Sequence, residues 1–574
     1  MKITLIVFCI MIFLSDLMQS QQYSFEYGKI GKDEMEMKSF PNDTSAEAVV
    51  IYDIGESGFY YIDYEFFIYF KRQMKIKVLK ESYLDDATLF IPLAVGSSGE
   101  EKLNKIEITT YNLDNSEYKK TVFNKDHIYR EKINDYWNRL RIAFPDVRKG
   151  SIIEINYEII SPYKLLLRDW KFQNRIPTIY SKYVTKMLPF YEYTYILQGA
   201  EKFDESTNYQ SKGFGVTVNG KDYKENVYEF VMKNVPSFTD ESFISSEDDY
   251  LIKLDFQLTK INQLGGGSIN ILSTWEEVIN DLLKEEKFGV YIKKAEKDFS
   301  KIIKDNTIIS KPENEKIEFV INYLKQNFSV DNNFGEYSYK TINDFLKEKK
   351  GNVGAINLYL IGALQVLGLE VYPVILSTRT NGKIIRQYPF IEPFNYVLAY
   401  VKYNDKARLL DATDQFCPND MIPVKCINDV GLIVRKGEVK WIDLSQNHKM
   451  SFLQNDFKAE LTKKGDTLYG SYVGTTTNYT ALGLRKRYEN DTEKMAEEIL
   501  PANSELTDSV TTENYHNISE PYKIKYSLSC VNDRINKKIF IHPFFNDAIK
   551  DNPFKEEERK YPVDMIFPKT VNYT

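Results

Sequence analysis

Residues 349–376, KKGNVGAINLYLIGALQVLGLEVYPVIL, decide the fold that we expect for this chain. Asn352 is placed to cap a helix, because its side-chain oxygen can accept hydrogen bonds from amides of the first turn. After it, apolar residues recur at intervals of three and four, which predicts a buried helix. Gly368 stands where a left-handed C-terminal cap needs no Cβ, and residues 371–376 read as a buried central strand. The apolar face consists of Ile356, Tyr359, Leu360, Ala363, Leu364 and Leu367.

Two later segments add strands to this unit. Residues 394–400, FNYVLAY, predict one strand, and residues 410–414, LDATD, place Asp411 at the end of another. This order of helix, strands and aspartate resembles the core of the bacterial transglutaminase-like superfamily, which has a papain-like fold. That resemblance implies a Cys at the helix start, a His on the next strand and an orienting Asp on the third. The positive helix end would favour the thiolate, and the His would move its proton.

The reactive atoms of that family are missing from the matching positions. With Gly351 and residues 367–369 aligned, the Cys position falls on Val353 and the His position on Tyr396, while Asp411 matches. Valine cannot attack a carbonyl, and a phenol with a pKa of about 10 is a poor base at neutral pH. The resemblance therefore implies a transglutaminase-like fold without its chemistry, that is, a pseudoenzyme.

Three functional hypotheses stay open. The preferred one is a non-catalytic transglutaminase-like protein of the cell envelope with a binding or scaffold role, whose cleft is lined by Val353, Tyr396 and Asp411. Its ligand would be an unknown protein, peptide or glycan. The alternative is a transglutaminase or cysteine-peptidase-like enzyme with a relocated active site, using Cys417 or the Tyr396 hydroxyl. The third is a polysaccharide-associated protein whose β domains bind and whose middle domain is a spacer.

Both flanking regions predict strands, so the expected fold is multidomain α+β. Residues 22–264 alternate apolar and polar positions, which favours an antiparallel β-sandwich. Within them, residues 145–150 separate two strand patterns and predict a hairpin. The segments 144–151, FPDVRKGS, and 170–173, WKFQ, resemble an N-terminal domain of unknown function that accompanies transglutaminase-like cores in exported bacterial proteins.

The transglutaminase-like domain is expected at residues 269–450. The glycine-rich residues 265–268 before it suit a flexible connector or a hairpin tip. Thr274 with Glu277 and Ser310 with Glu313 predict capping boxes for two further helices.

Residues 451–574 predict a β-rich C-terminal domain that resembles the small β domain of the same family. We expect one helix over residues 479–500 within it. We also expect this domain to be abbreviated or truncated, with open sheet edges.

Charge and aromatic content limit the classes of partner that we expect. A net charge of -7 without a basic stripe argues against nucleic-acid binding. The 42 tyrosines suit strands with one wet face, and a carbohydrate-stacking surface is the alternative explanation.

The first 21 residues predict a signal peptide. Lys2 precedes an apolar run over residues 3–14, which is too short to span a bilayer. No later segment approaches a membrane span, so we expect an exported bacterial protein that is periplasmic or secreted.

Cysteine and histidine usage offers no cofactor or metal site. Cys417 and Cys426 could form a disulfide in an oxidising compartment or remain two buried thiols. Four scattered histidines show no metal-ligand spacing.

Overall fold

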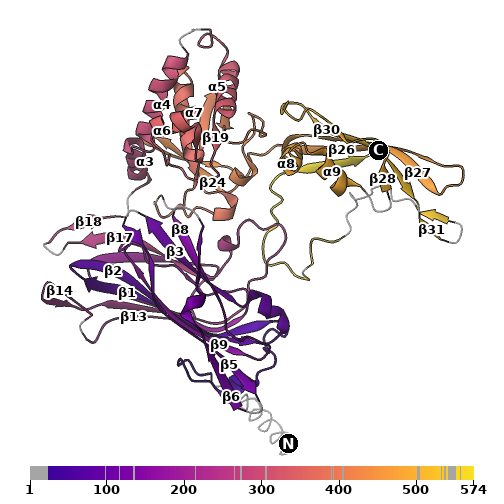
Figure 1. The fold of residues 1–574 in the computed structure, drawn as a ribbon. Helices are drawn as coiled ribbons and strands as arrows, with labels where there is room; N and C mark the ends of the chain where they lie inside the picture. Colours follow the sequence, from indigo (N-terminus) through magenta and orange to yellow (C-terminus); the bar gives the residue numbers. More distant parts are fainter. Residues whose placement is uncertain are drawn as a thin grey trace, which may run out of the picture. The chain divides into compact units, whose positions relative to one another are not determined.

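The computed structural model describes residues 23–574 except 97, 115–116, 134–135, 214, 264–265, 272–273, 304–306, 390, 392, 404–405, 501–503, 532, 536–537, 541–550 and 556 (Figure 1). The chain is multidomain and strand-rich, with several sheets, as the sequence predicts. It forms two compact units, Met1–Asp240 with Tyr250–Leu272, and Glu241–Asp249 with Ser273–Thr574. The expected signal peptide and Gly265 lie outside the described residues.

The first unit is built on an eight-stranded sheet. Strands β1 and β11 pair in parallel, so this sheet is mixed rather than purely antiparallel. Its strands, in spatial order, are β13 (Glu205–Gln210), β16 (Asn226–Val235), β11 (Thr178–Met187), β1 (Ala48–Ile62), β2 (Glu65–Val78), β9 (Ile152–Ser161), β5 (Lys102–Asp114) and β6 (Glu117–Val122).

Two smaller sheets share an apolar core with the large one. Ile91, Ile142 and Leu254 from the small sheets pack in one buried cluster with Ile153 and Phe230 from the large sheet. One small sheet has the order β4 (Gly99–Glu100), β3 (Thr88–Gly96), β8 (Trp137–Ala143) and β7 (Tyr129–Lys132). The other contains β10 (Trp170–Lys171), β17 (Lys253–Asn262) and β12 (Tyr191–Gln198), with β18 (Ser268–Asn270) beside β17.

The predicted hairpin around residues 145–150 is wrong. The flanking strands β8 and β9 belong to different sheets, and the turn carries the chain from one sheet to the other. Asp146 and Gly150 have φ of 50° and 90°, and the Asp146 carbonyl accepts from Asn112 Nδ2 at 2.9 Å. Alternation identified both strands correctly but did not tell which strands they pair with. For the glycine-rich residues, the hairpin tip is the alternative that the structure supports. Gly266 and Gly267 lie in the turn between β17 and β18, where Gln263 N donates to Gly267 O.

The middle part of the second unit places helices against a five-stranded antiparallel sheet. Helices α4, α5 and α7 stand side by side (Figure 1). The helices are α3 (Trp275–Lys284), α4 (Gly289–Ile302), α5 (Glu313–Asn327), α6 (Ile342–Glu348) and α7 (Val353–Val366). The sheet order is β23 (Lys406–Leu410), β22 (Tyr396–Tyr403), β21 (Val371–Leu376), β24 (Val430–Arg435) and β25 (Glu438–Asp443), and β19 (Ser329–Val330) pairs with β20 (Lys350–Gly351).

Helix α7 and strand β21 follow the expected boundaries. Asn352 Oδ1 accepts from Ala355 N at 3.2 Å, and Gly368 has φ of 82°. The Thr274 capping box is present at α3. The capping box expected at Ser310 is wrong, because α5 starts after Pro312 and the Ser310 hydroxyl donates to the Thr307 carbonyl instead.

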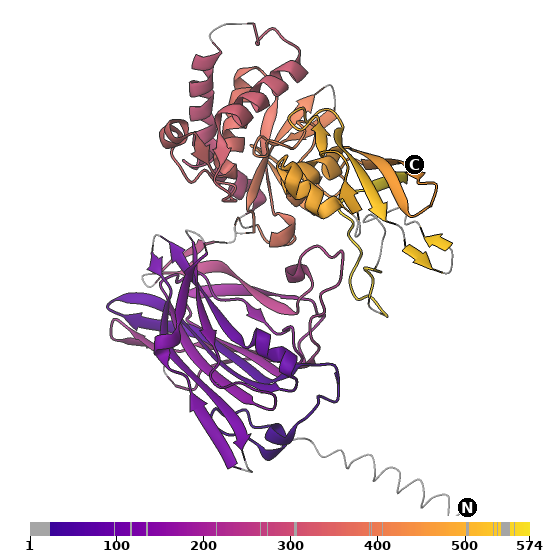
Figure 2. The ribbon, with the colours of Figure 1, turned by 45° about the vertical axis from the view of Figure 1, so that its right-hand side comes forward.

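The C-terminal part is a six-stranded sheet with two helices on one face (Figure 2). The single helix expected over residues 479–500 is two helices, since Glu489 and Asn490 have positive φ and Asp491 caps the second. The helices are α8 (Asn478–Tyr488) and α9 (Thr492–Ile499). The sheet contains β28 (Ser504–Leu506), β30 (Tyr522–Val531), β27 (Thr467–Thr476), β26 (Ser451–Leu461) and β33 (Lys569–Tyr573), with β29 (Thr511–Glu513) beside β30.

Strand β33 pairs in parallel with β26 and covers that edge of the C-terminal sheet. None of the helices in the described part of the chain combines the length and apolar character that crossing a membrane requires.

Candidate functional site

The three candidate site residues, Val353, Tyr396 and Asp411, lie at element ends that meet in the middle part of unit 2. Val353 is the first residue of α7, Tyr396 the first of β22, and Asp411 follows β23 directly. Val353 and Tyr396 belong to one buried apolar cluster. The Tyr396 hydroxyl donates to Asp411 Oδ2 at 2.8 Å. The fold therefore brings this tyrosine and this aspartate into direct contact.

Every oxygen of the Asp411 carboxylate is engaged by protein donors. Oδ2 accepts from Tyr396 Oη and from Asn357 Nδ2, each at 2.8 Å. Oδ1 accepts from the Thr413 amide at 2.9 Å and the Thr413 hydroxyl at 2.6 Å. A carboxylate offers about four lone-pair positions, and here four donors use them.

Asn357 is the member of this network that sequence reasoning missed. Its amide also donates to Val397 O at 2.8 Å, and its carbonyl accepts from Ala412 N at 3.0 Å. Asn357 is fully buried on the largely apolar helix α7. An amide in the apolar middle of such a helix was the pattern that could have identified it, because buried polar groups need partners.

The expected cleft does not open onto these positions. Val353 and Tyr396 expose 0% of their surface and Asp411 exposes 2%. The Phe334 ring lies 6.1 Å from the Tyr396 ring, and Lys425 Nζ lies 4.3 Å from the centroid of Phe334. Burial, with Asp411 next in importance, raises the pKa of Tyr396 well above its ordinary value. The phenol therefore stays protonated and donates.

The two candidate cysteines are free thiols in the structure. Cys417 exposes 1% of its surface and Cys426 0%. Cys417 Sγ donates to the Met421 carbonyl oxygen at 3.6 Å. Burial raises the pKa of both thiols well above the ordinary range, and Asp411 adds to the shift. Lys325 donates to the Cys417 carbonyl at 2.6 Å, while burial lowers its own pKa. Neither sulfur is a thiolate at neutral pH, which removes nucleophilic character.

The described part of the chain contains no group of three or more His, Cys, Asp or Glu side chains that could hold a metal ion. The Asp411 carboxylate already accepts four hydrogen bonds from protein donors.

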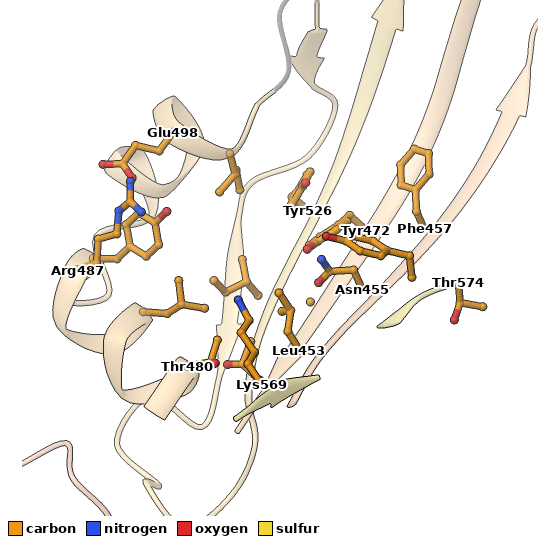
Figure 3. A pocket seen from close by; sticks show the side chains of 17 residues that line it. Leu453, Asn455, Phe457, Tyr472, Thr480, Arg487, Glu498, Tyr526, Lys569 and Thr574 are labelled. Atoms are coloured by element: carbon orange, nitrogen blue, oxygen red, sulfur yellow. The ribbon is translucent and has the colours of Figure 1, made fainter. Parts of the chain in front are cut away.

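A cavity of about 400 Å³ lies elsewhere in unit 2, between the C-terminal sheet and its two helices (Figure 3). Its sheet side presents aromatic rings, including the cross-strand pair Tyr472 and Tyr526, which stack with centroids 4.7 Å apart. Gly470 makes room for the Phe457 ring, since a Cβ there would lie 2.4 Å from the ring.

Charged groups border the helical side of the same cavity. Arg487 of α8 and Glu498 of α9 form an ion pair at 2.6 Å, as Figure 3 shows, and Lys569 of β33 also lines the cavity. An aromatic floor with polar groups at its border is typical of a ligand site.

Comparison with known protein families finds no family that matches this chain, and comparison with curated proteins finds no relative. Among solved structures, the chain is similar to a crystal structure from Parabacteroides distasonis that is described as a putative protease. The TM-score is 0.49 with 10% sequence identity, over 87% of this chain and 95% of that one.

Proposed function

We propose that this protein is a non-catalytic, transglutaminase-like protein of the cell envelope with a binding role. The observation that supports it best is the closed network around Asp411. At the positions where a papain-like core would hold its thiol and imidazole, Val353 and Tyr396 are fully buried. The carboxylate that would orient a base is occupied by Tyr396, Asn357 and Thr413.

The order of the elements supports the papain-like interpretation of the middle part. An apolar helix, α7, precedes the antiparallel strands β21, β22 and β23, and the aspartate follows the last of these. This order supports the proposed correspondence of Val353, Tyr396 and Asp411 with the three positions of a papain-like site.

The relocated enzyme receives less support. Cys417 and Cys426 are both buried and held as thiols, and Tyr396 is a donor to Asp411 rather than an acceptor of protons. A cysteine nucleophile requires a thiolate that its substrate can reach.

The binding role needs an accessible site instead, and the cavity between α8, α9 and the C-terminal sheet supplies one in unit 2. A protein, peptide or glycan remains its candidate ligand. Periplasmic or secreted location follows from the expected signal peptide and is part of the same proposal.

Thiol labelling of the full chain tests the absence of catalysis. The native protein is treated with an electrophilic thiol reagent, and labelled cysteines are located by peptide mass spectrometry. We expect Cys417 and Cys426 to stay unlabelled until denaturant is added, while the partly exposed Cys530 serves as the accessible control.

Amine incorporation and peptide hydrolysis are measured on the same samples. Stoichiometric native-state labelling of Cys417 or Cys426, together with a turnover that the label abolishes, would overturn the proposal.

A further inference from the structure

A second cavity, in unit 1, lies between the large sheet and the small sheet that contains β12 and β17. Its volume is about 410 Å³, within the range of about 300–1,000 Å³ that ligand pockets occupy. Strand pairing sets its walls. On one side Thr185 of β11 pairs with Tyr228 of β16, and on the other Tyr195 of β12 pairs with Phe256 of β17. The cavity therefore belongs to this unit alone.

Two buried hydroxyls distinguish this cavity from a packing defect. Thr185 exposes 0% of its surface, and its Oγ1 has no hydrogen-bond partner among the described residues. The same holds, among the described residues, for the buried Oη of Tyr193. Both residues line the cavity. An unpaired buried hydroxyl costs about 1–3 kcal/mol, so two of them on residues that line one cavity favour a ligand with hydroxyl partners.

Aromatic rings supply the rest of the wall. Six of the twelve lining residues are aromatic, and Tyr195 is 43% exposed at the border. Tyr195 and Phe256 each meet Phe230 edge-to-face, with centroids 4.8 Å and 6.3 Å apart. Rings at such angles do not form the two parallel walls that a planar base needs, but their electron-rich faces attract polarised C–H groups.

The charge of the lining selects a neutral ligand. None of the described residues that line the cavity is Lys, Arg or His, so an anion finds no counter-charge. The single acidic residue, Glu192, accepts from Asn262 Nδ2 at 2.7 Å and pairs with Lys260 at 3.4 Å. Burial raises the pKa of Tyr193, so its hydroxyl remains a donor as well as an acceptor.

We propose that this cavity binds a neutral saccharide, whose C–H faces contact the aromatic wall and whose hydroxyls pair with Thr185 and Tyr193. A fatty acyl chain would fill the volume but leave both hydroxyls unpaired. The inference does not rest on the proposed function, because the cavity lies outside the unit that holds Asp411.

Saturation-transfer NMR on the full chain tests the assignment with glucose, N-acetylglucosamine, maltose and cellobiose. We expect transfer to at least one of them at millimolar concentration, strongest at ring C–H protons. The change Tyr193→Phe should weaken that binding about threefold to tenfold, the value of one neutral hydrogen bond. Adding Thr185→Val should reduce it further. Hydrogen exchange of β11 and β12 in the unliganded protein should stay level or slow, because each change removes an unpaired polar group.

Tyr209→Phe is the matched control. It removes a tyrosine hydroxyl from the neighbouring strand β13, where that hydroxyl donates to Glu229 and lies outside the cavity, so saccharide binding should stay at its original level. The proposal fails if none of the four sugars shows transfer, or if binding survives in the double variant. It also fails if adenosine binds and the sugars do not. Binding of dodecanoate in place of the sugars, tightened in the double variant, would likewise refute it.

Discussion

Replacing Asp411 by Asn is the change that tests most directly how the helices and the five-stranded sheet of unit 2 are held together. The new amide nitrogen must occupy one of the two carboxylate positions, and each position now faces two donors. On the Oδ2 side these are Tyr396 Oη and Asn357 Nδ2, and on the Oδ1 side the amide and hydroxyl of Thr413. Tyr396 Oη and Thr413 Oγ1 lie 2.9 Å apart, so each hydroxyl has an alternative partner in the other. One buried amide donor, of Asn357 or of Thr413, is then left unpaired, and the expected loss is about 1–3 kcal/mol.

Hydrogen exchange of the full chain, followed by mass spectrometry on peptides from α7 and β22, measures this loss locally. A single unfolding curve would not serve, because a multidomain chain is not two-state. A loss of about 2 kcal/mol corresponds to exchange about thirtyfold faster where opening is local. Asp420→Asn makes the same chemical change at a carboxylate that is 50% exposed and paired with Lys449, and should cost at most about 1 kcal/mol.

Equal effects of the two substitutions, or unchanged protection of α7 in Asp411→Asn, would refute this account of the network. A double-mutant cycle with Tyr396→Phe adds a further check. The two changes remove the same contact, so their combined effect should be smaller than the sum of the separate effects.

Three further predictions follow from particular side chains. Val353→Cys combined with Tyr396→His should create a thiol with an apparent pKa below the free value of about 8.5, because the helix N-terminus and the imidazole both favour the thiolate. The pKa is measured by following the thiolate absorbance as the pH rises. A thiol that titrates at the free value would show that the alignment of Val353 and Tyr396 with the Cys and His positions is wrong. Gly362→Ala should destabilise α7 by about 1–3 kcal/mol, since its Cβ would lie 2.6 Å from Ile292 O. Gly483→Ala in α8 meets no atom within 4 Å and should stabilise that helix by about 1 kcal/mol. Hydrogen-exchange rates measured in the two helices would contradict this prediction if both substitutions had the same effect. Burial raises the pKa of Tyr83 to about 12 and that of Tyr396 well above its ordinary value. The stability that these phenols contribute is therefore complete below about pH 10 and is lost as the pH rises beyond it. A phenolate titration in which every tyrosine ionises near its ordinary pKa, with the protein still folded, would exclude this prediction.

Local patterns predicted the elements around the site well. The cap at Asn352, the glycine at Gly368 and the strand β21 depend on neighbouring residues alone, and each occurs where the sequence places it. Capping and periodicity act within a few residues, so one sequence contains the information.

Features that depend on residues far apart in the sequence could not be predicted in the same way. The alternation of β8 and β9 identified two strands but not their partners, which depend on residues far along the chain. The break between α8 and α9 rests on Glu489 in a left-handed conformation, which no pattern of apolar residues reveals. Both cavities arise from side chains on several strands, so their residues are scattered in the sequence.

The presence of a buried aspartate at position 411 has a physical explanation in the same network. Its donors come from α7, from β22 and from the segment after β23, so the carboxylate links three elements by hydrogen bonds. A buried carboxylate with all its lone pairs used cannot also orient an imidazole, unless that ring replaces one of the donors. Tyr396 is one of these donors, so substitution there exchanges one partner and leaves Asn357 and Thr413 in place. The aspartate is thus explained by structure alone, and its presence is no argument for catalysis in this chain.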